Sequence, residues 1–553
     1  MSDKRKNDVM TWLGLPTEFN FATGRPLGRI LGWGAVGLYG TIVLLLATGL
    51  IVVVAATLAH FVEVKTSWEG YRWSLLTIAT LTATLGAAIA LPMTILKTRY
   101  TQRQTVAAEQ NLITDRINQA VAGLGAEKVV KVLTQGADGE ARVVERSAPN
   151  IEVRVGAILS LERISISSPP DHVRIMEILC AYVRENACIV PVKENPKKPE
   201  DWKQRTDTQM ALTVIGRRGP DKITLEQARG YALDLRGADV QLADMSEGAW
   251  QKARLSDAVM ARALLFNANL QEANLWDANL QQANLWDANL QEAKLGGANL
   301  QEAGLWDANL QEADLGGANL QEADLGGANL QEAKLGDANL QEAKLGGANL
   351  QEAKLGGANL QQAKLGGANL QEAKLGGANL QQANLWAANL QEANLGGANL
   401  QEANLGRANL QEASLGHANL QEAKLGGANL QEANLWSANL QEASLGRTNL
   451  QWAKLWDAKL NSANLRNWTI ARTFLRSAEF TDSQNLSQES VNSAFGVASG
   501  IGQTVLPDGV TPPEHWHIGE DAQEDSDAHL KAAWDAYQDW LASLPEDRDD
   551  TSP

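Results

Sequence analysis

The chain of 553 residues carries 65 Asp and Glu against 48 Lys and Arg, a formal net charge of −17 at pH 7. This acidity argues against direct nucleic-acid binding, which draws on Lys and Arg to neutralise phosphates. Only 2 Cys and 6 His are present, too few for a disulfide scaffold or an obvious metal cluster. The excess acid lies in two segments: residues 268–467 hold 22 acids and 12 bases, and residues 514–553 hold 12 acids and 2 bases, a net charge of −10 in each.

Two long runs without charged residues stand near the N-terminus. Residues 30–62 form a run of 33, and Trp73–Leu96 forms a second run of 24 after a connection of ten residues. About 20 apolar residues suffice to cross a bilayer, so the runs predict two antiparallel transmembrane helices. Five Lys or Arg precede the first run and only two lie in the connection, which predicts cytoplasmic termini. A cleaved signal peptide is the alternative, but it would have a shorter apolar region and no second run close behind.

Residues 99–219 are predicted to form a small, mostly helical domain. Apolar positions recur at three- and four-residue spacing in Gln110–Ala122 and Val153–Ile164, and a Pro-Pro pair separates the second of these from a further helix. Between the two, Lys128–Glu145 is predicted to form two strands joined by a Gly-Ala-Asp-Gly turn. In a reducing cytoplasm Cys180 and Cys188 are interpreted as free thiols.

A five-residue period dominates the next part of the chain. Every fifth position from Leu235 to Phe480 is hydrophobic, and Leu occupies 44 of these 50 positions. Neither a helix nor a flat strand would bring residues five apart to one face. The chain must therefore turn a corner every five residues, as a solenoid with Leu and Ala inside. A superimposed ten-residue beat leaves open whether a coil contains ten, twenty or thirty residues.

Tandem repetition of Ala-Asn-Leu and two further residues, first seen complete at Ala268, resembles the pentapeptide-repeat family over roughly residues 233–480. That resemblance implies a right-handed, four-sided β-helix with five residues per side. The expected fold is mainly β: a right-handed quadrilateral β-helix, or pentapeptide-repeat solenoid, that follows a transmembrane helical hairpin and a small helical domain. The expected divisions are a cytoplasmic N-terminal segment (1–29), the hairpin (30–98), the helical domain (99–219), the β-helix (220–480) and a C-terminal cap, amphipathic helix and acidic tail (481–553).

With four pentads per coil, residues twenty apart lie above one another and outward side chains form rows. Two faces then carry Glu rows, and Lys rows lie between them. Like charges about 5 Å apart repel, so a Glu row either keeps a long rod soluble or meets a partner. Trp at outward positions is a stronger candidate for contact, with capping of the ends as the alternative. The candidate partner-contact residues are Trp286, Trp306, Trp436, Trp456, Glu292, Glu312, Glu332 and Glu352.

Past Phe480 the five-residue phase is lost, and a short helix is expected to close the open end of the β-helix. Residues 528–544 are predicted to form an amphipathic helix that either docks on the rod or binds a partner. The last residues, 546–553, are acidic and expected to be disordered.

No nucleophile with its base and no phosphate-binding loop is visible in the sequence, so we expect no catalytic residue, cofactor or metal and no small-molecule substrate. The first interpretation is a non-enzymatic scaffold in the bacterial inner membrane, with both termini and the repeats in the cytoplasm and an unknown protein as partner. The resemblance implies an alternative, because some pentapeptide-repeat proteins resemble DNA in width and charge and bind DNA gyrase. Those proteins are soluble dimers, whereas this chain has an apolar hairpin and Lys rows. The sequence leaves the oligomeric state open.

Overall fold

The computed structural model describes residues 26–63, 68–135, 141–192, 197–198, 201–499, 503–518 and 526–544. They divide into two compact units, which meet within one helix between Asn118 and Gln119. Three predicted features lie outside the described residues: the N-terminal segment up to residue 25, the turn at 136–140 and the acidic tail from residue 545.

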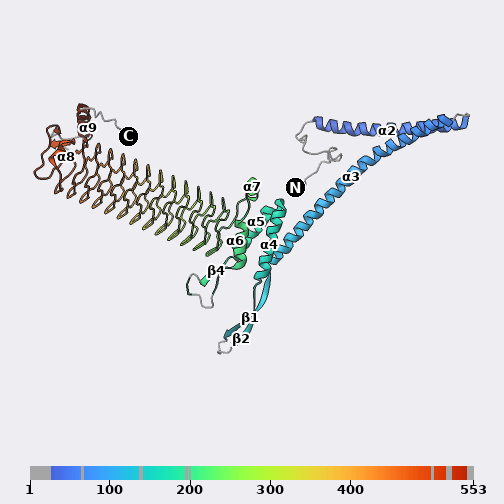
Figure 1. Ribbon diagram of the computed structural model, residues 1–553, viewed down its shortest axis with the longest axis horizontal. Coiled ribbons are helices and arrows are strands. Elements are labelled where there is room, and N and C mark those ends of the chain that lie inside the picture. Colours follow the sequence, from blue (N-terminus) through green and yellow to red (C-terminus); the bar gives the residue numbers. More distant parts are fainter. Residues whose placement is uncertain are drawn as a thin grey trace. The chain divides into compact units, whose positions relative to one another are not determined.

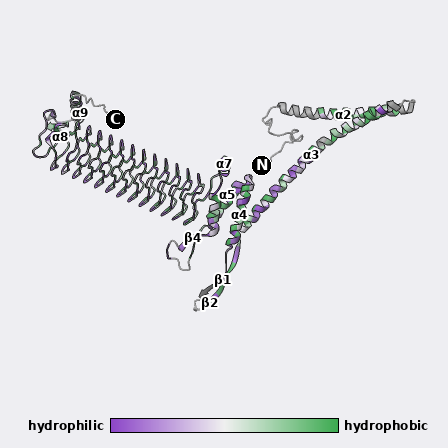
Figure 2. Cartoon of the chain, viewed as in Figure 1, coloured by the Kyte–Doolittle hydropathy of each residue, from purple (hydrophilic) through white to green (hydrophobic). Residues whose placement is uncertain are grey.

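The first unit consists of two long helices, α2 (Pro26–Glu63) and most of α3 (Trp68–Leu124) (Figure 1). Both are long and apolar enough to cross a membrane, in Leu38–Ala59 and in the stretch of α3 that begins at Leu75. The Tyr39 hydroxyl donates a hydrogen bond to the Ala88 carbonyl, so the two helices are neighbours there. Apolar side chains face outward: Leu45 and Ile51 are 70% and 66% exposed, an arrangement that is costly in water. Hydrophilic residues become frequent only toward the C-terminal half of α3 (Figure 2).

A small, mostly helical domain opens the second unit. The predicted hairpin is confirmed: β1 (Glu127–Gln135) pairs antiparallel with β2 (Ala141–Pro149). The predicted helices are also confirmed, as α4 (Ile151–Ser167) and, after the short 3-10 helix η1 (Pro169–Asp171), α5 (His172–Asn186).

The segments that follow connect this domain to the repeats. A second antiparallel pair, β3 (Ile189–Pro191) and β4 (Trp202–Gln204), precedes α6 (Thr206–Gly216) and α7 (Pro220–Ala228). Helices α4, α5 and α6 pack together around the buried side chains Ile158, Leu161, Ile175, Leu179 and Leu212.

From Asp234 onward the chain winds in coils of twenty residues. Asp234 bridges Arg254 in parallel, Asn269 bridges Asn289, and the same interval continues to Asn464 with Gln484. Each coil therefore contains four pentads, and the open choice between ten, twenty and thirty residues is decided for twenty. At about 4.8 Å between neighbouring strands, some twelve coils give a solenoid roughly 60 Å long.

Each corner of a coil is a tight turn that places Leu and Ala inside. Ala273 donates its backbone N–H to the Leu270 carbonyl at 2.9 Å, and Glu272 between them has φ of 55°. Type II turns need a positive φ at this third residue. Leu270 and Ala273 have no exposed surface, and the same pair of buried positions recurs in each repeat.

Both ends of the solenoid are covered. At the first coil, Ala249 donates to the Gly216 carbonyl at the end of α6, and the fully buried Trp250 lies against Gly216. A Cβ added at Gly216 would lie 3.0 Å from the Trp250 ring, so glycine permits this close packing. The N-terminal helical domain therefore caps the first coil and protects its edge.

The C-terminal end is closed by the last segments of the chain. Phe495 and Val505 take the places of repeat residues, bridging Phe474 and Glu479, so pairing continues past Phe480. The predicted short helix is α8 (Gln488–Asn492), and β5 (Val497–Ser499) pairs in parallel with β6 (His517–Ile518). Helix α9 (Ser526–Ser543) packs its Ala533 and Tyr537 against Phe474 and Phe495. The amphipathic C-terminal helix thus docks on the solenoid.

Candidate binding surfaces of the solenoid

The solenoid presents four faces, and equivalent positions of one face lie twenty residues apart in successive coils. We name each face by one of its outward residues. In order around a coil they are the Glu292 face, the Lys334 face, the Glu302 face and the Lys344 face. The two Glu-bearing faces are consequently opposite each other, and the Lys-bearing faces separate them. This arrangement follows directly from the twenty-residue interval of the backbone bridges.

The four candidate Glu residues lie where the sequence pattern placed them, in one outward row of the Glu292 face. Glu292, Glu312, Glu332 and Glu352 are all exposed, with φ of 56°, 57°, 57° and 57°. A residue with a Cβ pays roughly 1–2 kcal/mol in this left-handed region, whereas glycine pays almost nothing. Gly297 and Gly317 occupy the same turn position on the Lys334 face. The turn itself would therefore favour glycine, and the Glu side chains need another explanation.

Among the described residues, none of these four carboxylates has an ion-pair or side-chain hydrogen-bond partner. Elsewhere on the solenoid such pairs do occur: Lys252 contacts Glu272 at 3.3 Å, and Lys344 contacts Asp324 at 3.2 Å. The middle of the Glu292 face is thus an uncompensated row of negative charge.

Exposed Trp side chains lie on the two Lys-bearing faces. Trp286 and Trp306 follow each other in one column of the Lys344 face and are 51% and 50% exposed. Their indoles lie against glycines of the following coil: a Cβ added at Gly304 would stand 2.6 Å from Trp286 Nε1, and one at Gly326 would stand 2.8 Å from Trp306 Cδ1. One side of each ring is therefore seated on backbone and the other faces solvent.

The second Trp pair lies at the C-terminal end of the Lys334 face and is less open. The rings of Trp436 and Trp456 are 6.0 Å apart, and His417 meets Trp436 edge-on at 4.3 Å. Trp436 is 39% exposed, while Trp456 is half-buried and packs against Phe474. Trp456 thus belongs to the cluster that α9 covers, and only Trp436 of this pair reaches solvent freely.

Two ladders of Asn side chains, which sequence reasoning did not assign, run along the Glu-bearing faces. On the Glu302 face, Asn339 donates to Asn319 at 3.0 Å and the chain of amide bonds extends from Asn279 to Asn439. A matching ladder runs from Asn289 to Asn449 on the Glu292 face. Satisfied amide ladders stabilise stacked strands. The signal in the sequence was Asn before the Leu of every second pentad.

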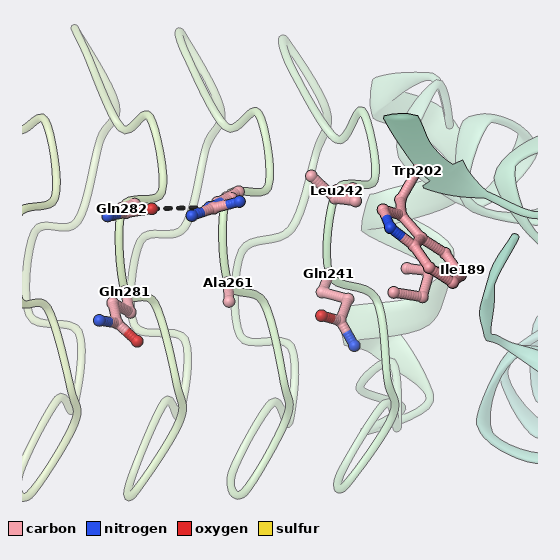
Figure 3. A pocket seen from close by; sticks show the side chains of 8 residues that line it. Ile189, Trp202, Gln241, Leu242, Ala261, Gln281 and Gln282 are labelled. Atoms are coloured by element: carbon pink, nitrogen blue, oxygen red, sulfur yellow. Dashed lines mark hydrogen bonds between the residues drawn. The ribbon is translucent and has the colours of Figure 1, made fainter. Parts of the chain in front are cut away.

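A groove opens at the N-terminal end of the Glu302 face (Figure 3). Its volume is about 250 Å³. Trp202 and Ile189 of the β3–β4 pair form one wall, and side chains of three successive coils form the floor: Gln241, Leu242, Ala261, Arg262, Gln281 and Gln282. Gln204 donates to the Asp239 carbonyl at 3.0 Å, which fixes the wall to the first coil. Sequence reasoning missed this groove because it joins segments far apart in the chain.

The helical domain contains a buried Ser, His and Glu in contact. His172 Nδ1 lies 2.6 Å from Ser165 Oγ, and His172 Nε2 lies 2.7 Å from Glu226 Oε1. Arg218 pairs with the same carboxylate at 2.9 Å, and burial lowers the pKa of Arg218. All four side chains are less than a tenth exposed, so a substrate has no access to the Ser hydroxyl. We therefore assign this network to packing of the domain.

A second buried network surrounds Asp207. Arg205 donates to this carboxylate at 2.6 and 3.0 Å, and the Tyr182 hydroxyl donates at 2.5 Å. Burial first, and the hydrogen bond to Asp207 second, raise the pKa of Tyr182 to about 12. Burial also raises the pKa of the Cys180 thiol to about 11, which keeps this free cysteine protonated and unreactive.

Comparison with known proteins identifies the repeats. A family model described as pentapeptide repeats matches in eight copies, over segments that run from residues 268–307 to 428–467. HetL, a pentapeptide repeat protein involved in heterocyst differentiation regulation in the cyanobacterium Nostoc sp. strain PCC 7120, is 34% identical; the match covers 44% of this chain and 98% of HetL, with a TM-score of 0.29.

Other solved structures also match parts of the chain. Rfr23 of the cyanobacterium Cyanothece 51142 is 41% identical over 18% of this chain and 58% of its own, with a TM-score of 0.10. QnrB1, a plasmid-mediated fluoroquinolone resistance protein, is 15% identical over 39% of this chain and 92% of its own, with a TM-score of 0.21. No curated protein matches the chain significantly.

Proposed function

The chain belongs to the pentapeptide-repeat family, and from this premise we propose that it is a non-enzymatic, membrane-anchored scaffold that presents its solenoid to a protein partner. The observation that carries the proposal is a long solenoid, capped at both ends, whose faces hold exposed Trp and uncompensated Glu. Solenoids offer extended surfaces of this kind to partners. Because pentapeptide repeats imply a right-handed β-helix, we also propose that this solenoid is right-handed.

The membrane anchor in the proposal is the α2–α3 hairpin. Its outward apolar side chains, such as Leu45 and Ile51, would be matched by lipid rather than by water. The distribution of Lys and Arg around the two helices supports cytoplasmic termini, and with them a cytoplasmic solenoid at the bacterial inner membrane. Our proposed divisions of the chain remain 1–29, 30–98, 99–219, 220–480 and 481–553.

Reporter fusions test the topology. A fusion after Lys97 is expected to report the cytoplasm, and one within residues 65–72 is expected to report the opposite side. A fusion after Lys97 that reports the outside would contradict the proposed orientation.

The proposed partner surface combines the Trp286–Trp306 pair with the Glu row of the neighbouring Glu292 face. Large aromatic side chains dominate the energy of many interfaces, whereas rim charges mainly steer association. The binding energy is therefore expected to rest on the two indoles, and the Glu row is expected to favour a basic partner.

Co-purification tests the scaffold itself. Detergent-solubilised full-length chain is expected to retain a specific protein, and Trp286→Ala with Trp306→Ala is expected to weaken that association at least about tenfold. Trp276→Ala is the matched control, because Trp276 is 47% exposed on the Lys334 face. Equal loss with the control would remove the proposed surface, and absence of any specific protein would remove the scaffold's main support.

A second candidate function is mimicry of DNA toward gyrase or another nucleic-acid-binding protein. The observation that favours it is the pair of opposite Glu-bearing faces, which carry Glu at most coils in the middle of the solenoid, although Gln362 and Gln382 interrupt the row of the Glu302 face. The Lys rows between them weaken such a likeness. Inhibition of gyrase supercoiling by the full-length chain in nanodiscs is the test, and activity unchanged at micromolar protein would exclude this function.

A further inference from the structure

The groove between the β3–β4 pair and the first three coils differs in chemistry from one end to the other. At the first coil, the Trp202 ring and the Ile189 side chain stand opposite Leu242 (Figure 3). At the second coil the floor carries the guanidinium of Arg262, and at the third it carries the amide of Gln282. An apolar end is thus followed, about 4.8 Å further along the solenoid, by a cationic one.

Arg262 is held in place with part of its donor capacity free. Its Nε donates to Gln282 Oε1 at 2.6 Å, and Gln282 Nε2 donates in turn to Glu302 Oε2 at 2.8 Å. The terminal nitrogens of Arg262 have no hydrogen-bond partner among the described residues. A guanidinium that is already oriented binds a planar carboxylate with little further loss of side-chain freedom.

The described residues that line the groove include no acidic side chain, and the carboxylate of Asp239 in the first coil is already engaged. Asp239 accepts hydrogen bonds from the Gln241 amide at 2.9 and 3.1 Å and does not pair with Arg262. The net charge that the groove offers to a ligand is therefore positive at Arg262, in contrast to the Glu rows beyond it on the same face.

We propose that this groove binds the free C-terminal carboxylate of a partner polypeptide whose last side chain is apolar. The carboxylate would meet the terminal nitrogens of Arg262, and the last side chain would lie between Trp202, Ile189 and Leu242. One residue spans the distance between neighbouring coils from its carboxylate to its side-chain tip, so both contacts are made at once. The proposal deepens the scaffold function and rests on it in one respect, namely that the ligand is a protein.

The groove is specific to this position on the solenoid. Arg407 has the same turn conformation, with φ of 57° against 59° for Arg262, and is likewise exposed. It lies over the Trp386 ring at 5.8 Å and is not among the described residues that line this groove. Arg407 therefore offers a matched control with the same backbone geometry and charge.

The test measures, by isothermal titration calorimetry, the affinity of the full-length chain in detergent for three peptide probes. Acetyl-Gly-Gly-Leu with a free carboxylate is expected to bind. Its C-terminal amide and acetyl-Gly-Gly-Gly acid are each expected to bind at least about tenfold more weakly, since one lacks the charge and the other the apolar side chain. In Arg262→Gln, the affinity for the Leu acid is expected to fall to the affinity for its amide. In Arg407→Gln, the affinity for the Leu acid is expected to stay unchanged.

Equal affinity for the acid and the amide would overturn the proposal, as would equal losses in Arg262→Gln and Arg407→Gln. Absence of binding by the Leu acid at millimolar concentration would overturn it as well. None of these results would affect the scaffold function, because co-purification of a partner through Trp286 and Trp306 is measured independently.

Discussion

The helical domain and the solenoid are stabilised by different kinds of buried contact. The solenoid repeats one buried pair, Leu and Ala, at most of its corners, so each coil contributes much the same packing as its neighbours. The helical domain instead buries charged and polar side chains that pair with specific partners: Arg154, His172, Asp207, Arg218 and Glu226.

The two regions are expected to differ in how well they tolerate substitutions. In a repeat array each coil contacts only its neighbours, so the loss of one side chain is confined to adjacent coils. A buried charge that loses its partner remains uncompensated, because no water reaches it. We expect single substitutions to destabilise the helical domain more than the solenoid.

Asp207→Ala is expected to destabilise the helical domain by about 3–5 kcal/mol. The substitution leaves Arg205 and the Tyr182 hydroxyl without their buried acceptor. Hydrogen exchange of α5 and α6 measures the effect locally. Asp337→Ala, at an exposed turn of the solenoid, is the control and should leave exchange in α5 and α6 unchanged. Equal protection in both variants would contradict the contrast between the two regions.

The same carboxylate predicts a dependence on pH. Burial acts to raise the pKa of Asp207, but hydrogen bonds from Arg205 and Tyr182 outweigh it and hold the pKa below its usual value. With an unfolded-state pKa of about 3.9, the stabilisation is fully present above that pH and is lost as pH falls through the lower folded-state pKa. Wild type should therefore lose more stability than Asp207→Asn on acidification below about pH 4, as measured by urea unfolding of α5 and α6.

Leu340→Ala is expected to cost about 2–5 kcal/mol, because the side chain is 1% exposed and its removal leaves a cavity. The loss should be confined to the coils on either side, which hydrogen exchange resolves. Lys344→Ala on the following pentad is the exposed control. Faster exchange in distant coils or in the helical domain would show that the array responds as one unit.

Asn349→Ala tests the amide ladder and should cost about 1–2 kcal/mol. It removes the bonds to Asn329 and Asn369, each 3.1 Å long, and the bond from the Gln351 backbone at 3.3 Å. Asn394→Ala removes only the corresponding turn bond to Gly396, so it separates the turn from the ladder. If the two variants lose the same stability in thermal unfolding, the ladder contributes nothing.

Glu352→Gly should have the smallest effect and the opposite sign, a gain of about 0.5–1 kcal/mol. Glycine adopts the positive φ of 57° at this exposed turn without the conformational cost that a residue with a Cβ has there. Gln351→Gly, one residue earlier and without a positive φ, should instead destabilise. A loss of stability in Glu352→Gly would mean that the Glu row serves the fold rather than a partner.

Sequence reasoning anticipated the parts of the fold that depend on local pattern. The five-residue period required a solenoid, and the family resemblance supplied the twenty-residue coil that the backbone bridges confirm. The β1–β2 hairpin and helices α4 and α5 follow from short-range alternation and spacing. Outward positions such as Trp286 and Glu292 could be named in advance, because one coil length assigns every row.

Contacts between distant segments could be decided only by the tertiary structure. Trp456 has the same outward place in its pentad as Trp306, yet it is half-buried, because Phe474 and α9 pack around it. Likewise, Trp202 and Arg262 line the same groove only because the β3–β4 pair is fixed to the first coil at Asp239. Periodicity specifies which side of the chain faces inward, since that depends on neighbours along the sequence. Which segments pack on the outer faces of the solenoid depends on residues tens of positions away in the sequence. The repeat pattern carries no information about that packing.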